Sequence, residues 1–248
     1  QLESDTFSTG YPFLDTCLDG GWEIGSLNVI MAPPKTGKST ALCNIAAQSI
    51  QLGYNTLYIT LEMSDKKIAK RIGANTFDIP MKEYNEVAKN KAYIKEKLKE
   101  IGQQNLKIPG KLFIKQYPAS SAGVPDIENY IRKMEETTQT KFTVVIIDYI
   151  NIMKNWRNPN TENTFMKVKQ ICEDLRAMAT RLKFACVSAT QTGRSGYESS
   201  NITMNDVSES RGLTETVDSL FALQQDALMK ARGFIDIKAI ALRNPEGM

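Results

Sequence analysis

The sequence predicts an α/β fold in which a mostly parallel, twisted sheet carries helices on both faces. Short apolar segments alternate with longer segments of helical periodicity through most of the chain, and this alternation is typical of a doubly wound sheet. The run "FTVVIIDYINIM" (142–153) is apolar almost without interruption, as expected of a parallel strand that is covered on both faces. We expect the last two strand-like runs, 217–226 and 234–244, to be antiparallel.

The elements follow from apolar periodicity and from turn residues. The turn-rich segment "LDGGWEIGS" (18–26) predicts a hairpin or a tight turn. Helices are expected at 124–139, which begins with Pro125 and Asp126, at 163–183, and across most of the lysine-rich segment 64–104. Pro80 should interrupt that segment, and Gly102 should end its last helix. The remaining strands are predicted at 27–32, 56–61, 111–117 and 184–191.

Composition limits the chemistry that the chain can perform. Its 248 residues carry a net charge of +3 and no histidine, which excludes a Cys/His zinc site and Ser-His-Asp or Cys-His catalysis. A general base must therefore be a carboxylate or a lysine. The four cysteines lack C-x-x-C spacing, so we expect them to be reduced in a cytoplasmic protein. No apolar run reaches the roughly 20 residues of a membrane span.

No internal repeat or convincing domain boundary is visible, so residues 1–248 are expected to form a single domain. The chain begins with Gln1 and ends with "RNPEGM", which resembles the turn of an unfinished hairpin. We therefore interpret the sequence as a fragment that lacks an N-terminal domain and its extreme C-terminus.

The segment "VIMAPPKTGKSTALCNIAA" (29–47) predicts a phosphate-binding loop between a strand and a helix. In such a Walker A loop, backbone N–H groups and the helix N-terminus surround the phosphates, while the lysine reaches the β- and γ-phosphates. Ala32 stands where the usual pattern has glycine, and the change is tolerated if its φ suits alanine. The predicted nucleotide-binding residues are Ala32, Pro33, Pro34, Lys35, Thr36, Gly37, Lys38, Ser39 and Thr40.

Three further strand ends carry candidate catalytic groups. Asp148, after four apolar residues in "VVIIDY", completes a Walker B pattern and can hold Mg²⁺ together with the Ser39 hydroxyl. Glu62 follows strand 56–61 and supplies a second acid that can orient the attacking water. Gln191 ends strand 184–191 and can sense a γ-phosphate. The alternatives are a surface acid for Glu62 and a loop-capping amide for Gln191.

The segments "LEMS", "IIDYINIM", "SATQTGRS", "SESRGL" and "ALRN" occur in this order along the chain. Together they resemble the RecA-like P-loop ATPase domain of DnaB-like hexameric replicative DNA helicases. The stretches "QLGYNTLYITLEMS", "AKRIGAN", "KQYP" and "MNDVSESRGL" are most similar to the replicative helicases of T-even bacteriophages. The resemblance extends over essentially the whole chain.

The resemblance implies an ATP-dependent motor that translocates on single-stranded DNA and unwinds duplex at a phage replication fork. It implies ATP and Mg²⁺ as cofactors, a homo-hexamer, and primase and a helicase loader as possible partners. Lys38, Glu62, Asp148 and Gln191 would form the site in one subunit. Arg243 in "ALRN" would be an arginine finger that enters the neighbouring subunit's site, unless it is a hairpin arginine facing solvent.

Members of this family usually carry a lysine two residues before the finger, where this chain has Ala241. One of two charges supplied in trans is then missing or comes from elsewhere, for example from Lys238.

The resemblance also places the loops after 142–153 and after 184–191 at the DNA channel. Lys154, Arg157 and Arg194 are the expected phosphate contacts. Trp156 and Tyr197 could stack on bases or pack at subunit boundaries.

Two other functions use the same motifs. A RecA- or KaiC-like ATPase would use them for strand exchange or regulation, and unwinding of a forked duplex would distinguish the helicase from it. A non-catalytic module would bind ATP only to control assembly, which does not require Lys38, Glu62 and Asp148 together.

Overall fold

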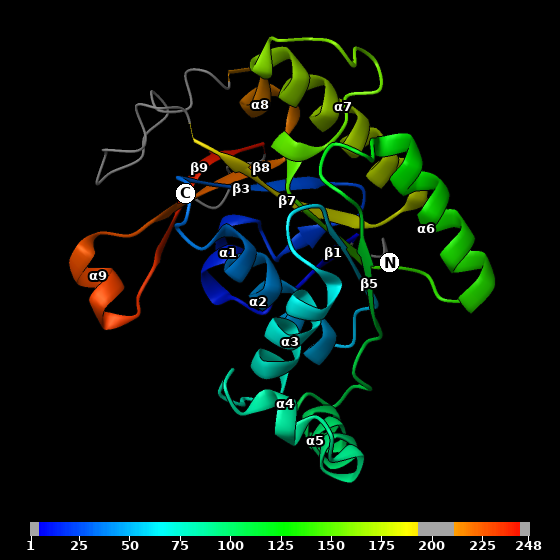
Figure 1. Cartoon of the computed structure of the whole chain (residues 1–248), viewed down its shortest axis with the longest axis vertical. Helices are drawn as coiled ribbons and strands as arrows, with labels where there is room; N and C mark the ends of the chain where they lie inside the picture. The colour runs from blue at the N-terminus through cyan, green and yellow to red at the C-terminus, as the bar shows by residue number, and fades with distance from the viewer. Residues whose placement is uncertain (1–4, 193–210, 244–248) are drawn as a thin grey trace.

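The computed structural model describes residues 5–192 and 211–243. Its central feature is a seven-stranded sheet with the strand order β5-β4-β6-β7-β3-β8-β9 (Figure 1). A two-stranded antiparallel pair, β1 (Thr6–Phe7) with β2 (Trp22–Glu23), lies outside it. The strands of the main sheet are β3 (Leu27–Ala32), β4 (Thr56–Thr60), β5 (Leu112–Gln116), β6 (Val144–Asp148), β7 (Ala185–Gln191), β8 (Ser219–Gln224) and β9 (Asp236–Leu242).

All strands of the main sheet except β9 run parallel to their neighbours. The expectation for the two late strands is therefore only half right: β9 is antiparallel to β8, but β8 pairs in parallel with β3. A β-bulge shifts the register between β8 and β9 at Leu220/Phe221. Because β9 is antiparallel, the chain that follows it returns to the sheet edge at which β3 and β8 begin.

Helices cover both faces of the sheet (Figure 1). One face packs under α6 and α7, around a core that includes Ile131, Leu175 and Phe184. The other face packs under α2 and α3, around Leu42 and Ile68. The helices are α1 (Pro12–Cys17), α2 (Lys38–Gln51), α3 (Asp65–Thr76), α4 (Tyr84–Val87), α5 (Lys91–Gln104), α6 (Val124–Thr138), α7 (Thr164–Leu182), α8 (Arg211–Thr216) and α9 (Ala227–Arg232).

The lysine-rich segment forms α3, α4 and α5, which extend away from the sheet (Figure 1). Pro80 interrupts the helices as expected, between α3 and α4. Gly102 does not end the last helix, because α5 continues to Gln104. In the described part of the chain, no helix has the length and apolar composition that would let it cross a membrane.

The contrast between two leucines tests the core assignment. Leu175 on α7 is fully buried, whereas Leu106 after α5 is 91% exposed. We expect Leu175→Ala to lower the free energy of unfolding by about 2–5 kcal/mol, because it removes buried methyl groups and leaves a cavity. Leu106→Ala should change it by less than about 0.5 kcal/mol. Urea denaturation of both variants measures the difference, and equal destabilisation would contradict the core described above.

Candidate nucleotide site

The phosphate loop joins the end of β3 to the start of α2. Ala32 is the last residue of β3, so its extended backbone suits alanine and glycine is not required there. Gly37 precedes α2 with a φ of +92°, which only glycine adopts readily. Lys35 also has a positive φ, of +63°. The strand, the loop and the helix N-terminus therefore occur in the arrangement that the sequence predicts.

Lys38 is buried at the first position of α2 and folds back onto the loop. Its Nζ donates hydrogen bonds to the carbonyl oxygens of Ala32 at 3.3 Å and Pro33 at 3.1 Å. Burial lowers the pKa of Lys38, and the negative charges of Glu62 and Asp148 oppose that shift. Neutral carbonyls bind an ammonium group less strongly than phosphate oxygens do. The ammonium group can therefore exchange these partners for a phosphate.

Asp148 ends β6 with its carboxylate buried beneath the loop. Burial raises its pKa, and the hydroxyls of Tyr58 and Ser39 oppose the rise. Tyr58 on β4 donates to Oδ2 at 2.9 Å, and it stays protonated because burial and the adjacent Asp148 raise its own pKa. Among the described residues, none makes a hydrogen bond with Oδ1.

A buried carboxylate oxygen that lacks a partner calls for an explanation. The Ser39 hydroxyl lies close to the same carboxylate, at the edge where a nucleotide's phosphates would sit. Carboxylate and hydroxyl oxygens are hard ligands of the kind that Mg²⁺ prefers, either directly or through bound water. Ser39 and Asp148 therefore fit the metal that the sequence predicts at this position.

The predicted residues of one subunit's site surround one cleft of about 450 Å³. Glu62 reaches it from the end of β4 and Gln191 from the end of β7. Gln191 Nε2 donates to the hydroxyl of Tyr149 at 2.9 Å, and the ring of Tyr149 lies 5.8 Å from Lys38 Nζ. An amide that contacts a phosphate here would therefore also be connected to the residue that follows Asp148.

Three lining residues were not identified from the sequence: Met63, Arg71 and Tyr149. Tyr149 directly follows the Walker B aspartate, so its position next to the site could have been noticed. Arg71 lies on α3, and no sequence pattern links it to the loop. It enters the cleft only because α3 packs beside α2. It adds a positive charge to a cleft that would receive an anion.

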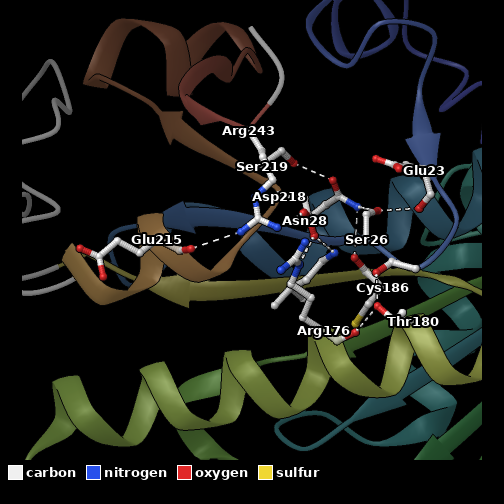
Figure 2. A network of polar contacts seen from close by, with 12 residues as sticks. Glu23, Ser26, Asn28, Arg176, Thr180, Cys186, Glu215, Asp218, Ser219 and Arg243 are labelled. Carbon is white, nitrogen blue, oxygen red and sulfur yellow. Dashed lines mark hydrogen bonds and ion pairs between the residues drawn. The ribbon is translucent and has the colours of Figure 1, made fainter.

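Arg243 lies at the opposite edge of the sheet from this cleft. It follows β9, whose last residue, Leu242, pairs with Ser219 at the beginning of β8. Its Nη1 donates to Asp218 Oδ1 at 2.9 Å, and its Nη2 donates to the carbonyl oxygen of Glu215 at 3.3 Å (Figure 2). Arg243 therefore does not share a site with Lys38 and Glu62 within one copy of the chain.

The predicted DNA-contact residues are in different environments. Lys154 is exposed on the loop after β6. Arg157 forms ion pairs with Glu173 and Asp174 on α7, and Trp156, which is half-exposed, donates its indole N–H to Asp174. The remaining candidates, Arg194 and Tyr197, lie outside the described residues.

Tyr58→Phe should isolate the role of the hydroxyl on Asp148. The change leaves Asp148 Oδ2 buried without its donor, so we expect the free energy of unfolding to fall by about 1–3 kcal/mol. Nucleotide affinity measured with excess Mg²⁺ should fall, whereas affinity measured in EDTA should not. Tyr130→Phe, at a partly buried tyrosine on α6, is the control for removal of a phenol hydroxyl. An unchanged Mg²⁺ dependence in Tyr58→Phe would contradict this role.

Comparison with known proteins identifies the family. The model of the DnaB-like helicase C-terminal domain matches residues 6–241. The chain is 35% identical over 211 residues to the DnaB-like replicative helicase of Enterobacteria phage T4. The match covers 85% of this chain but 44% of that protein, so the chain spans less than half of this relative's length.

Two solved structures share the fold, each with a TM-score of 0.75 and 18% identity. One is an isolated ATPase domain, which is matched over 98% of this chain and 87% of that one. The other is a DnaB-like replicative helicase studied with its primase interactions, which is matched over 97% and 57%. The RecA-like core expected from the sequence is therefore confirmed, and the chain belongs to the family of DnaB-like helicase C-terminal domains.

Proposed function

We propose that this domain is the ATP-hydrolysing motor of a replicative DNA helicase, which moves along single-stranded DNA and separates duplex at a phage replication fork. One observation carries the proposal: the chain holds a nearly complete phosphate site at one edge of its sheet and a partly exposed arginine at the other. The similarity to the phage T4 replicative helicase supports the biological setting. In that setting the protein works in the host cytoplasm.

One subunit binds the nucleotide through its own cleft. The backbone N–H groups of the loop and the N-terminus of α2 face the phosphates, and Lys38 exchanges its carbonyl partners for phosphate oxygens. Ser39 and Asp148 hold Mg²⁺, which when bound neutralises charge that develops on the phosphates. Glu62 orients the attacking water, and Gln191 contacts the γ-phosphate.

The arginine finger requires a second copy of the chain. Because Arg243 and the phosphate loop lie at opposite sheet edges, one copy can present its arginine only to the cleft of another. Such a head-to-tail contact closes into a ring when the rotation between copies permits, and a homo-hexamer is the ring we propose. An arginine supplied in this way accelerates phosphoryl transfer by about 10³–10⁵-fold in comparable enzymes.

The DNA track involves the loop after β6 and the segment after β7, with Lys154 and Arg194 as phosphate contacts. We give Arg157 a lesser part, because Glu173 and Asp174 already neutralise its guanidinium. The solved DnaB-like helicase with the same fold is described together with its interactions with primase. Primase and a helicase loader are therefore the proposed protein partners of this chain.

The alternatives explain less of what is observed. A RecA- or KaiC-like ATPase would share the core, but the family match over nearly the whole chain is to helicases. A non-catalytic module would have no use for Glu62 beside Lys38 in one cleft, next to a buried Asp148. Fork unwinding and DNA-stimulated turnover distinguish the three functions.

ATP hydrolysis by the full-length protein, with and without single-stranded DNA, tests the proposal. We expect DNA to stimulate turnover, and turnover per subunit to rise with protein concentration, because each site needs a neighbour's arginine. Glu62→Gln is the control: it should bind nucleotide normally and turn over about 10²–10⁴-fold more slowly. Turnover that ignores both DNA and concentration would contradict the motor.

Lys154 and Arg157 offer a matched test of the DNA track. Removal of one phosphate contact should reduce the slope of log affinity against log salt by about 0.7 for a single strand. We expect Lys154→Ala to show this reduction. Arg157→Ala should leave the slope nearly unchanged and instead lower stability, because its charge is already paired within the chain. Fluorescence anisotropy with a labelled oligonucleotide at several salt concentrations measures both slopes, and equal slopes for the two variants would refute the distinction.

A further inference from the structure

Two arginines share one carboxylate at the sheet edge where β3 and β8 begin (Figure 2). Asp218 Oδ1 accepts a hydrogen bond from Arg243 Nη1 at 2.9 Å, and its Oδ2 accepts one from Arg176 Nε at 3.0 Å. The backbone N–H of Leu27 also donates to Oδ2, at 2.8 Å. Asp218 is thus attached to the first residue of β3, the strand that ends at the phosphate loop.

The cluster carries an excess positive charge. Among the described residues, Asp218 is the one carboxylate that forms an ion pair with either arginine. Glu215 contributes its backbone carbonyl to Arg243, while its carboxylate points away from the cluster (Figure 2). The side chains of Arg176 and Arg243 are 39% and 38% exposed. One carboxylate and two guanidinium groups leave an excess of one positive charge, which suits an external anion.

Arg176 has donors to spare for such an anion. Its contact with the carboxylate of Asp218 is made through Nε, so within the described chain its two terminal nitrogens stay available to a ligand. The side chain also lines a cleft of about 600 Å³ between α7 and α8. An arginine that is held at Nε and accessible at its other end presents a planar pair of donors to phosphate oxygens.

The position of Arg176 matches the charge that the sequence lacks at Ala241. Ala241 pairs with Leu220 and packs on the sheet face covered by α7, and Arg176 comes from α7. Lys238, the substitute suggested by the sequence, pairs with Ala222 further along the strand. It precedes Arg243 by five residues, or about 16 Å at roughly 3.3 Å per residue. Arg176 therefore replaces it as the partner of Arg243.

We propose that Arg176 acts with Arg243 as a second cation supplied in trans to the polyphosphate of a nucleoside triphosphate bound by the adjacent copy. Asp218 is the positioning residue that holds both guanidinium groups before the copies meet, which reduces the ordering cost of the contact. This inference rests on the proposed function, because it places the cluster at the neighbour's phosphate site.

The test begins with Arg176→Ala in the full-length protein. We expect kcat for ATP hydrolysis in the assembled state to fall about a hundredfold, as when one transition-state donor is removed. Binding of a fluorescent nucleotide to the same subunits should stay unchanged, because Arg176 does not line their own cleft. The thermal unfolding midpoint of each variant shows whether slower turnover reflects a disrupted structure.

Mixed assemblies then separate a trans role from a structural one. Arg176→Ala subunits keep an intact cleft, and Lys38→Ala subunits keep both arginines. Assembling the two variants together should give more turnover than the sum of the variants assembled alone. No recovery from this mixture, when Arg243→Ala with Lys38→Ala does recover, would refute the role of Arg176. Failure of both mixtures would refute the trans arrangement in the proposed function, and the inference with it.

A double variant provides the final discrimination. Arg176→Ala combined with Ala241→Lys restores a cation on the same face of the sheet, so we expect it to regain turnover relative to Arg176→Ala alone. A lysine on β9 would not replace an arginine whose only role is to hold Asp218 in place. Wild-type turnover in the Arg176→Ala single variant, or no recovery in the double variant, would overturn the proposal.

Discussion

The direction of the strands in the main sheet is the constraint on which the rest of the structure depends. Parallel hydrogen bonding places the ends of β3, β4, β6 and β7 at one edge, in register, with Ala32 beside Gln191 and Thr60 beside Asp148. Residues that are distant in the chain therefore line one cleft. Because β9 alone is antiparallel, the chain that follows it returns to the opposite edge. The separation of Arg243 from the cleft follows from that single reversal.

The buried charges at the two edges are satisfied to different extents. At the cleft, Lys38 is held by two carbonyls, and Asp148 accepts from Tyr58 through one oxygen while the other has no partner among the described residues. Each therefore keeps some capacity for a ligand. At the other edge, Asp218 accepts three hydrogen bonds and is well compensated, whereas the two arginines share it. Burying a charge without full compensation is costly. Such sites are therefore expected where a ligand or a second copy completes the interactions.

Strand β3 connects these two edges. Its first residue, Leu27, donates to Asp218, and its last residue, Ala32, accepts from Lys38. Both ends belong to one buried strand with hydrogen-bonded neighbours on each side. The site that binds a nucleotide and the arginines offered to a neighbour are therefore mounted on one rigid element. In a ring, this arrangement would place each subunit between two nucleotides.

The sequence by itself determined the local features: the P-loop between strand and helix, the aspartate after four apolar residues, and the helices at 124–139 and 163–183. These depend on apolar periodicity, glycine and short spacings, which are visible along the chain. Only the tertiary structure decided that β8 is parallel to β3, that Arg71 and Tyr149 enter the cleft, and that Glu173 and Asp174 neutralise Arg157. It alone brought Arg176 beside Arg243. These are contacts between segments distant in sequence, and no local pattern encodes which strand a segment pairs with or which helix packs beside it.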